Sequence, residues 1–330
     1  MEISQIMPRF SIIVPLYNKA SYVVKTLESI VAQSYNDWEC LIVDDGSTDN
    51  SRDIVEDYIK TLDVEKLRFV VLSQSNSGVS MARNRGVKES NGEFLCFLDA
   101  DDWWQNTFLE EIDKLISDYP NAGIYATNYV YYKIGKTHVA LNLKRGYIDY
   151  PKAYYESEAM PIWTGATCMP QKVFEEMGGF PVGIKLGEDF LLWAQTALNY
   201  KIVFCEKPLA YYNNNVPISM RATRNLHEPQ HHMLFALNSL ENLIEQLCNV
   251  SQKEEWKRLL DKLRVSGLMD YWLNERYHEI AEKEISKVDW SHLPPNTVKL
   301  YKRPIRLLKI QRRLMQIGSF IKQKCLRYYN

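Results

Sequence analysis

The first hundred residues alternate between short apolar runs and amphipathic segments, and this alternation constrains the fold more than any other feature of the chain. The apolar runs predict strands at 10–16, 38–43, 67–72 and 92–98. Helical patterns lie between them at 20–33, 49–62 and 78–90. This order predicts an α/β fold, with a doubly wound, mostly parallel sheet that carries helices on both faces.

Each predicted strand runs into polar residues at its C-terminal end. Ligands of open α/β sheets bind outside the carboxyl ends of the strands, so these residues are candidates for one shared site. They are Pro15, Tyr17, Asn18, Asp44, Asp45, Asn76, Asp99 and Asp101, and Arg83 lies in the helix after the third strand. Single members have ordinary explanations, because Ser47 or Asp49 can cap a helix and surface arginines are common.

Carboxylates are prominent among these candidates. Asp99 and Asp101 are one residue apart, directly after the fourth strand. Such a pair can hold a hard divalent cation, which in turn can neutralise a diphosphate. A carboxylate after the second strand, at Asp44 or Asp45, can accept the imide N–H of a uracil. The sequence therefore predicts a crevice shaped for a nucleotide, with a metal at one end.

Several classes of protein are disfavoured by what the sequence lacks. Neither Gly-x-Gly-x-x-Gly nor Gly-x-x-x-x-Gly-Lys follows any predicted strand, which argues against a dinucleotide dehydrogenase and a P-loop nucleotidase. No stretch approaches the roughly 20 apolar residues that span a bilayer, and residues 1–9 lack the apolar core of a signal peptide. The six cysteines are scattered, as in a reducing compartment. We expect a cytoplasmic location.

Charge is distributed unevenly along the chain. The stretch after Asp289 contains 10 basic residues and no acidic one, which leaves 30 basic and 41 acidic residues, a net charge of −11, for 1–289. An apolar stripe at helical spacing runs through the basic tail at Leu307, Ile310, Leu314, Ile317 and Ile321. Such a helix either docks on its own domain or lies on an anionic surface, at the inner face of the cell membrane. The acidic body argues against nucleic acid as a partner.

Four segments resemble, in order, the signatures of family-2 glycosyltransferases with the GT-A fold, of the kind that act in bacterial polysaccharide synthesis. They are 11–18, 43–49, 82–84 and 97–102, within a similarity that covers about 8–220. The resemblance implies a Rossmann-like fold for the nucleotide-binding half.

This resemblance also implies a division of the chain. A GT-A catalytic domain would occupy 8–225, with its nucleotide-binding half at 8–102 and its acceptor half at 103–225. A helical extension at 226–290 and the basic amphipathic tail at 291–330 would follow. Pro294 and Pro295 make 291–296 the predicted hinge before the tail.

The resemblance gives the strand-end residues their expected roles. It implies a nucleotide-sugar donor, usually a uridine diphosphate sugar, and Mn²⁺ or Mg²⁺ as the cofactor. The expected donor contacts are Pro15, Tyr17, Asn18, Asp44, Asp45, Asn76, Arg83 and Asp99. Asp101, together with Asp99, would ligate the metal. Asp44 alternatively serves the fold by bonding backbone amides.

On the acceptor side, Glu188 and Asp189 begin a predicted helix, where the helix dipole alone favours acidic residues. The resemblance implies that Asp189 is the catalytic base, with Glu188 beside it. It also implies an acceptor-side loop at Trp163, Thr164 and Gly165. Relatives often carry a His or Arg where this chain has three asparagines at 213–215, and Arg221 or Arg224 are the alternatives for that contact.

The implied function is an inverting, metal-dependent transfer of a sugar from a nucleotide diphosphate to a hydroxyl group. The acceptor would be a saccharide or lipid-linked saccharide in cell-surface polysaccharide synthesis. A sugar nucleotidyltransferase is one alternative, although the first strand is not followed by the Gly-rich, Arg-containing loop of that class. A catalytically silent nucleotide- or carbohydrate-binding module is another, and the presence of Asp99, Asp101 and Asp189 argues against it.

Overall fold

The computed structural model describes residues 7–62, 68–217, 220, 226–304 and 307–308. Contacts divide the chain into two compact units, Met1–Lys253 and Glu254–Asn330. This division lies elsewhere than the predicted boundaries after residues 225 and 290. No helix among the described residues is both long and apolar enough to cross a membrane.

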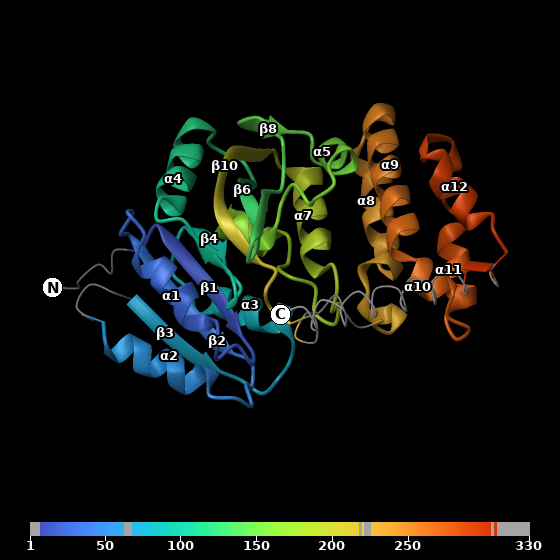
Figure 1. The fold of residues 1–330 in the computed structure, drawn as a ribbon. Coiled ribbons are helices and arrows are strands. Elements are labelled where there is room, and N and C mark those ends of the chain that lie inside the picture. Colours follow the sequence, from blue (N-terminus) through green and yellow to red (C-terminus); the bar gives the residue numbers. More distant parts are fainter. Residues whose placement is uncertain (1–6, 63–67, 218–219, 221–225, 305–306, 309–330) are drawn as a thin grey trace. The chain divides into compact units, whose positions relative to one another are not determined.

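The first unit is built around one sheet. Its described strands are β1 (Phe10–Leu16), β2 (Trp38–Asp44), β3 (Arg68–Ser73), β4 (Phe94–Phe97), β5 (Trp103–Trp104), β6 (Ile124–Lys133), β7 (Lys136–Val139), β8 (Gly146–Ile148), β9 (Thr167–Pro170) and β10 (Ile202–Asn213). They follow the order β3–β2–β1–β4–β9–β6–β10–β5, with β7 beside β6 and β8 beside β10 (Figure 1). The pairs β3–β2, β2–β1, β1–β4 and β6–β10 are parallel and account for most of the paired residues. The predicted α/β class and mostly parallel sheet are confirmed.

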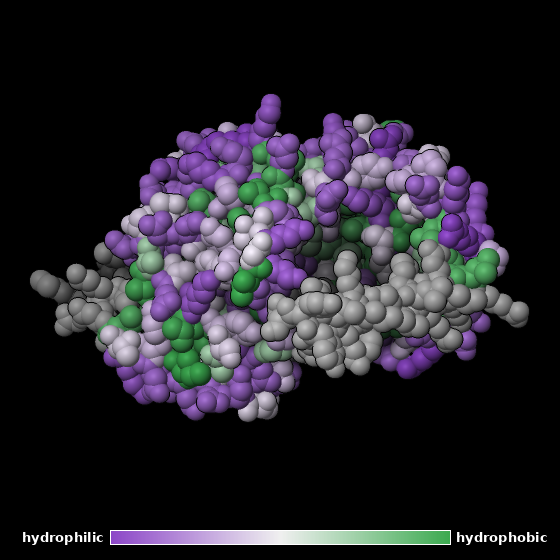
Figure 2. Space-filling view, viewed as in Figure 1, coloured by the Kyte–Doolittle hydropathy of each residue, from purple (hydrophilic) through white to green (hydrophobic). Residues whose placement is uncertain are grey.

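The helices predicted at 20–33, 49–62 and 78–90 are present, with ends that are shorter by one to three residues. The described helices of this unit are α1 (Val23–Val31), α2 (Ser51–Lys60), α3 (Val79–Lys88), α4 (Phe108–Asp118), α5 (Tyr150–Glu156), α6 (Gln171–Glu176), α7 (Glu188–Asn199) and α8 (Leu237–Leu247), with 3₁₀ turns η2 (Thr164–Ala166), η5 (Pro229–His231) and η6 (Met233–Phe235). In α1, Val23, Leu27 and Ile30 are fully buried and recur at spacings of three and four, as expected for a helix that covers a sheet. Most of the described residues on the face shown in Figure 2 are hydrophilic, with smaller apolar patches between them.

β10 departs from regular pairing next to β6. Thr127 pairs with Cys205, Asn128 with Pro208 and Tyr129 with Ala210, so the register shifts twice within a few residues. The Asn128 side chain compensates for the lost ladder, because its Nδ2 donates to the carbonyl oxygens of Glu206 (3.2 Å) and Leu141 (2.8 Å). This irregularity is a β-bulge in which the Glu206 carbonyl receives a side-chain hydrogen bond in place of a ladder bond.

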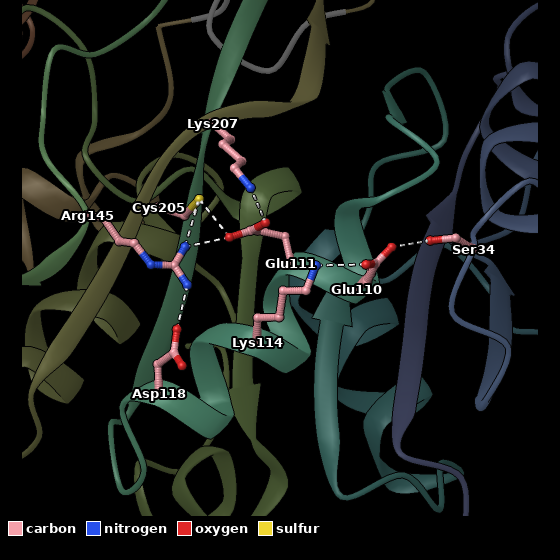
Figure 3. Close-up of polar contacts among 8 residues, drawn as sticks. All are labelled: Ser34, Glu110, Glu111, Lys114, Asp118, Arg145, Cys205 and Lys207. Carbon is pink, nitrogen blue, oxygen red and sulfur yellow. Dashed lines mark hydrogen bonds and ion pairs between the residues drawn. The ribbon is translucent and has the colours of Figure 1, made fainter.

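A buried carboxylate joins α4 to β10 (Figure 3). Glu111, 5% exposed, accepts hydrogen bonds from Arg145 Nη1 (2.5 Å) and Lys207 Nζ (2.6 Å). Arg145 also bonds Asp118 at the end of α4 (2.8 Å). Burial alone would raise the pKa of Glu111, but the bonds from Lys207 and Arg145 hold it below its usual value. The neighbouring Glu110 contacts Ser34 and Lys114 on the opposite side of the helix.

The second unit is helical in its described part. It contains α9 (Val250–Gly267), which begins just before the division, α10 (Met269–Trp272), α11 (His278–Ile285), η7 (Trp290–His292) and α12 (Pro295–Tyr301). Val265, Val288, Leu293 and Tyr301 form its apolar cluster. Leu293 lies in the segment predicted as a hinge, and the structure shows it packed in this cluster because apolar residues on both sides of the prolines share one core. Within the apolar stripe of the tail, Ile310, Leu314, Ile317 and Ile321 lie outside the described residues.

Candidate active site

The carboxyl ends of β1, β2 and β3 are level at one edge of the sheet. The register places Leu16 opposite Asp44 and Asp44 opposite Ser73. β4 runs parallel to β1 on its other side and leads into Asp99. The strand-end residues therefore share one edge, as a parallel sheet requires.

Asp45 organises the loop that follows β3. Its Oδ1 accepts hydrogen bonds from Gln74 Nε2 and the Ser77 amide (both 2.8 Å), and its Oδ2 accepts from the Gly78 amide (2.8 Å). The residue is only 4% exposed. Asp45 thus binds the Gln74 side chain and the backbone of Ser77 and Gly78, on both sides of Asn76, which is exposed.

Asn18 and Asp44 hold the loop between β2 and α2. Asn18 adopts a positive φ of 52° and its Oδ1 accepts from the Thr48 amide (2.8 Å), while Asp44 Oδ1 accepts from the Ser47 amide (3.1 Å). Gly46 also has a positive φ, 72°, and a Cβ there would lie 2.8 Å from the Asn76 amide nitrogen. Only glycine fits such a position without displacing the neighbouring loop.

Two of the predicted donor contacts remain accessible beside these loops. Tyr17, directly after β1, is 46% exposed, and Pro15 is half-buried. The edge therefore combines a rigid set of backbone loops with an aromatic ring that faces solvent. Such a surface can receive a flat base.

Arg83 connects the two halves of the site. It is 3% exposed, its Nη2 donates to Asp99 Oδ1 (2.8 Å) and its Nη1 donates to Glu188 Oε1 (3.0 Å). Burial works against the charge, but Asp99 and Glu188 outweigh it and raise the pKa of Arg83. Arg83 is predicted as a donor contact, and in the structure its guanidinium bridges the end of β4 and the start of α7.

Glu188 and Asp189 stand at the start of α7, where Gly187 has a positive φ of 84°. Burial, and next the charge of Asp189, raise the pKa of Glu188 to about 7 despite the nearby Arg83. Burial also raises the pKa of Asp189. Asp189 Oδ2 accepts from Thr164 Oγ1 (3.0 Å) and its Oδ1 accepts from the Phe190 amide (2.7 Å). Both oxygens of Asp189 are therefore oriented, and its pKa suits a base better than that of an exposed carboxylate.

The predicted metal ligand Asp101 has a cationic partner. Lys19 Nζ lies 2.5 Å from Asp101 Oδ2, and burial raises the pKa of Asp101 although Lys19 works in the opposite direction. Lys19 was missed by sequence reasoning, although a basic residue directly after the polar end of the first strand was a signal for it. Carboxylate oxygens from Asp99 and Asp101 fit a hard divalent cation. No group of three or more His, Cys, Asp or Glu side chains in the described parts of the chain is arranged for a metal.

Asp102 has a structural role beside this pair. It is 2% exposed and its Oδ1 accepts from the Asn213 amide (2.7 Å), which ties the end of β10 to the end of β4. Burial, followed by the charges of Asp101 and Asp99, raises its pKa well above the usual value. Asn213 Oδ1 accepts hydrogen bonds from the amide nitrogen and the side-chain Nδ2 of Asn215, and Asn215 Oδ1 accepts from the Ile134 amide in the β6–β7 hairpin. Arg221 and Arg224 lie outside the described residues.

The predicted acceptor-side loop lies beside Asp189. Trp163 packs against Gly165, where a Cβ would come within 2.5 Å of the indole ring. The Gly165 carbonyl accepts a hydrogen bond from Trp104 Nε1 (2.6 Å), and the Thr164 hydroxyl donates to Asp189 Oδ2. The tryptophan ring also contacts Tyr129 and Tyr212, with centroids 5.0 and 5.5 Å away.

Three comparisons with known proteins bear on this arrangement. Residues 11–178 match the model of the family described as "Glycosyl transferase family 2". The chain is 31% identical over 218 residues to the glycosyltransferase GlyA of Streptococcus pneumoniae serotype 4, which covers 62% of this chain and 30% of that protein. It is 40% identical over 104 residues to the putative teichuronic acid biosynthesis glycosyltransferase TuaG of Bacillus subtilis, covering 32% of this chain and 40% of that protein. The chain thus spans less than half the length of these two relatives.

A solved structure supports the fold. Residues 1–349 of TarS from S. aureus, in complex with UDP-GlcNAc, superpose with a TM-score of 0.71 at 19% identity, covering 85% of this chain and 82% of that one. Similarity at this identity shows a shared GT-A architecture. The family match extends over half of the chain and includes the strand-end residues of β1 to β4. The chain belongs to glycosyl transferase family 2.

Proposed function

We propose that this chain is an inverting, metal-dependent glycosyltransferase that moves a sugar from a nucleotide diphosphate, most simply a uridine diphosphate sugar, to a hydroxyl of a saccharide or lipid-linked saccharide. The observation that carries the proposal is Asp189. Its two oxygens are oriented by Thr164 and by the α7 backbone. Through Glu188, Arg83 and Asp99, the same helix start is connected to the strand ends that would hold the donor.

Asp189 acts as the general base in this proposal. It accepts the proton of the acceptor hydroxyl as that oxygen attacks the anomeric carbon. The bond from the anomeric carbon to the diphosphate oxygen breaks on the opposite face, so the anomeric centre is inverted. The raised pKa of Asp189 increases its basicity, and Thr164 holds the receiving oxygen in place.

The strand-end residues would bind the donor. Tyr17 and the loop that Asp45 fixes would surround the nucleoside, and Arg83 would keep Asp99 oriented toward it. A divalent cation, Mn²⁺ or Mg²⁺, held by Asp101 and Asp99 would neutralise charge on the leaving diphosphate. Lys19 places a further positive charge beside Asp101. In this scheme residues 8–102 are the donor half and 103–225 the acceptor half.

The relatives favour a particular choice of substrates. The TarS structure contains UDP-GlcNAc, which makes uridine diphosphate sugars the first donors to examine. The name of TuaG refers to teichuronic acid biosynthesis, which agrees with a role in making a cell-surface polysaccharide. An acceptor on a lipid carrier would bring the chain to the inner face of the cell membrane.

The test identifies the nucleotide product, removes the metal with a chelator and compares the chain with the Asp189→Asn variant. The chain is incubated with uridine diphosphate sugars and Mn²⁺, and the nucleotide products are separated. Free uridine diphosphate in excess of a no-protein blank is expected, and a chelator should abolish it. Asp189→Asn should keep donor affinity, measured by calorimetry, and lose about 10²–10⁴-fold in transfer, the usual contribution of a general base.

Other outcomes would replace the proposal. Pyrophosphate as the product would indicate nucleotidyl transfer, and donor binding without turnover of any sugar nucleotide would indicate a binding module. Near-normal transfer by Asp189→Asn would require another base, with Glu188 as the first residue to examine. Donor binding that ignores both a chelator and Asp101→Ala would contradict the metal assignment.

A further inference from the structure

A cavity of about 440 Å³ lies outside the site described above, at the C-terminal ends of β6 and β10. Its lining comes from the β6–β7 hairpin and from the segment after β10, and it includes Tyr131, Lys133, Lys136, His138 and Val216. Lys133, Lys136 and His138 are exposed, whereas Val216 is buried. The cavity is therefore a concave surface with an apolar base and a basic rim.

The chemistry of this lining is cationic and aromatic. No acidic side chain lines the cavity, and within the described part of the chain no ion pair involves Lys133 or Lys136. Tyr131 and His138 stack with centroids 5.0 Å apart and rings 29° from parallel, which gives a flat surface beside the two ammonium groups. This local positive charge contrasts with the net charge of −11 on residues 1–289.

Aromatic contacts connect the cavity to the proposed catalytic base. Tyr131 lies 5.7 Å from Tyr212, its partner in the β6–β10 register. Tyr212 lies 5.5 Å from Trp163, and the next residue, Thr164, bonds Asp189. Trp163 is buried, so these packed rings relate the cavity to the acceptor side of the site, toward which a chain of sugar units that presents one hydroxyl to Asp189 would extend.

We propose that this cavity binds the acceptor beyond the unit that receives the sugar, and that it selects a saccharide carrying carboxylate or phosphate groups. The inference rests on the proposed glycosyl transfer and adds the class of acceptor. The ammonium groups of Lys133 and Lys136 pair with the anionic groups through charge-assisted hydrogen bonds. The Tyr131–His138 stack provides an apolar surface for the sugar ring.

The experiment measures binding directly and does not depend on turnover. The full chain is titrated by calorimetry with tetragalacturonate and with glucose 6-phosphate, and each titration is repeated with the neutral counterpart, the carboxyl-reduced tetramer or glucose. At least one anionic probe should bind more tightly than its neutral counterpart. Lys133→Gln/Lys136→Gln should weaken that binding about five- to tenfold, as expected for the loss of two exposed ionic contacts.

A matched control separates the cavity from general charge effects. Lys88→Gln/Lys172→Gln removes the same charge from exposed positions on α3 and α6 and should leave the affinity for the anionic probe unchanged. Uridine diphosphate binding should be equal in all three proteins, so that failure of the donor site is recognised separately. Equal binding of charged and neutral probes, no binding of either anionic probe, or equal losses in the two double variants would overturn the proposal. Loss of phosphatidylglycerol vesicle binding in Lys133→Gln/Lys136→Gln, with oligosaccharide binding unchanged, would assign the surface to a membrane instead.

Discussion

At the scale of single residues, the site is dominated by charges that have little access to water. Arg83, 3% exposed, serves Asp99 and Glu188 together. Glu188 is itself beside Asp189, so three carboxylates share one nearby guanidinium. This excess of negative charge, added to burial, explains why Glu188 retains its proton to an unusually high pH.

A pH-dependent stability follows from Glu188. Its pKa of about 7 in the folded protein exceeds its ordinary value of 4.5, so the folded state binds the extra proton between these values. The free energy of unfolding should therefore fall as pH rises from about 4.5 to 7, by up to about 3 kcal/mol from this group. Because glutamine does not titrate, Glu188→Gln should reduce the slope of the free energy of unfolding against pH, which is measured by urea unfolding at pH 5, 6, 7 and 8. The exposed Glu89→Gln should leave the slope as it is, and an unchanged slope in Glu188→Gln would contradict the assignment.

The contacts of these residues explain what the sequence could and could not predict. The clustering of Asp45, Asp99 and Asn18 at one edge was predictable, because strand ends are visible as apolar runs and parallel strands end together. The contact of Arg83 with Glu188 joins residues 105 positions apart, and no local pattern encodes such a pair. The orientation of Asp45 toward the backbone amides of Ser77 and Gly78 likewise depends on how two loops meet.

At the scale of elements, the Glu111 cluster shows how a helix is tied to a strand. Glu111 on α4 receives Lys207 from the bulged part of β10 and Arg145 from the loop before β8. Lys207 and Arg145 both remain partly exposed. The Glu111 carboxylate is therefore the one member of the cluster that water cannot reach in the folded protein. Replacing it should lower the free energy of unfolding more than replacing Lys207 or Arg145.

Removing the charge of Glu111 should destabilise the first unit. Glu111→Gln is expected to lower the free energy of unfolding at pH 7 by about 1–3 kcal/mol, the cost of leaving hydrogen-bonded partners without a match. Because the folded pKa of Glu111 lies below 4.5, its stabilisation is present above that pH and is lost as pH falls through the folded pKa. The difference between the two proteins should therefore shrink in acid. Glu110→Gln is the control, since the adjacent side chain is exposed and should change stability much less; equal losses would refute the argument.

The strands and helices of the first hundred residues were predictable from periodicity, and later elements that were not have physical reasons. β9 has only four residues and pairs antiparallel between β4 and β6, so its place in the sheet depends on partners that its own sequence does not reveal. In the second unit, 291–296 reads as a hinge because of its prolines. Its Leu293 is buried by residues from α9 and α12, a tertiary contact that overrides the local pattern.

At the scale of the whole molecule, the acidic body and the basic tail are expected to contact different partners, and the tail is the candidate for binding an anionic membrane surface. In α12 of unit 2, Tyr301 Oη donates to the Val265 carbonyl (2.6 Å). A deletion that begins at residue 297 would remove Tyr301 and damage this core. A deletion of 309–330 removes six basic residues and no described one, so it is the cleaner test.

We expect the chain lacking 309–330 to lose cosedimentation with phosphatidylglycerol vesicles while it keeps donor binding. Each basic residue near an anionic surface contributes about 1 kcal/mol, which salt screens. Binding of the full chain should accordingly weaken as salt is raised from about 50 to about 500 mM, because the Debye length falls from about 14 Å to about 4 Å. A shortened chain that sediments as well as the full one would exclude the membrane role. A fall in melting temperature without any vesicle binding to lose would instead indicate that the tail docks on the protein.

The bulge in β10 limits how this chain can vary in length. Successive strand residues point to opposite faces, so removal of one residue between Cys205 and Ala210 would reverse every later side chain of β10. Tyr212 would then turn away from Trp163 and Tyr131, and the aromatic path from Asp189 to the basic cavity would be broken. Insertions or deletions at this point should therefore be tolerated only in pairs.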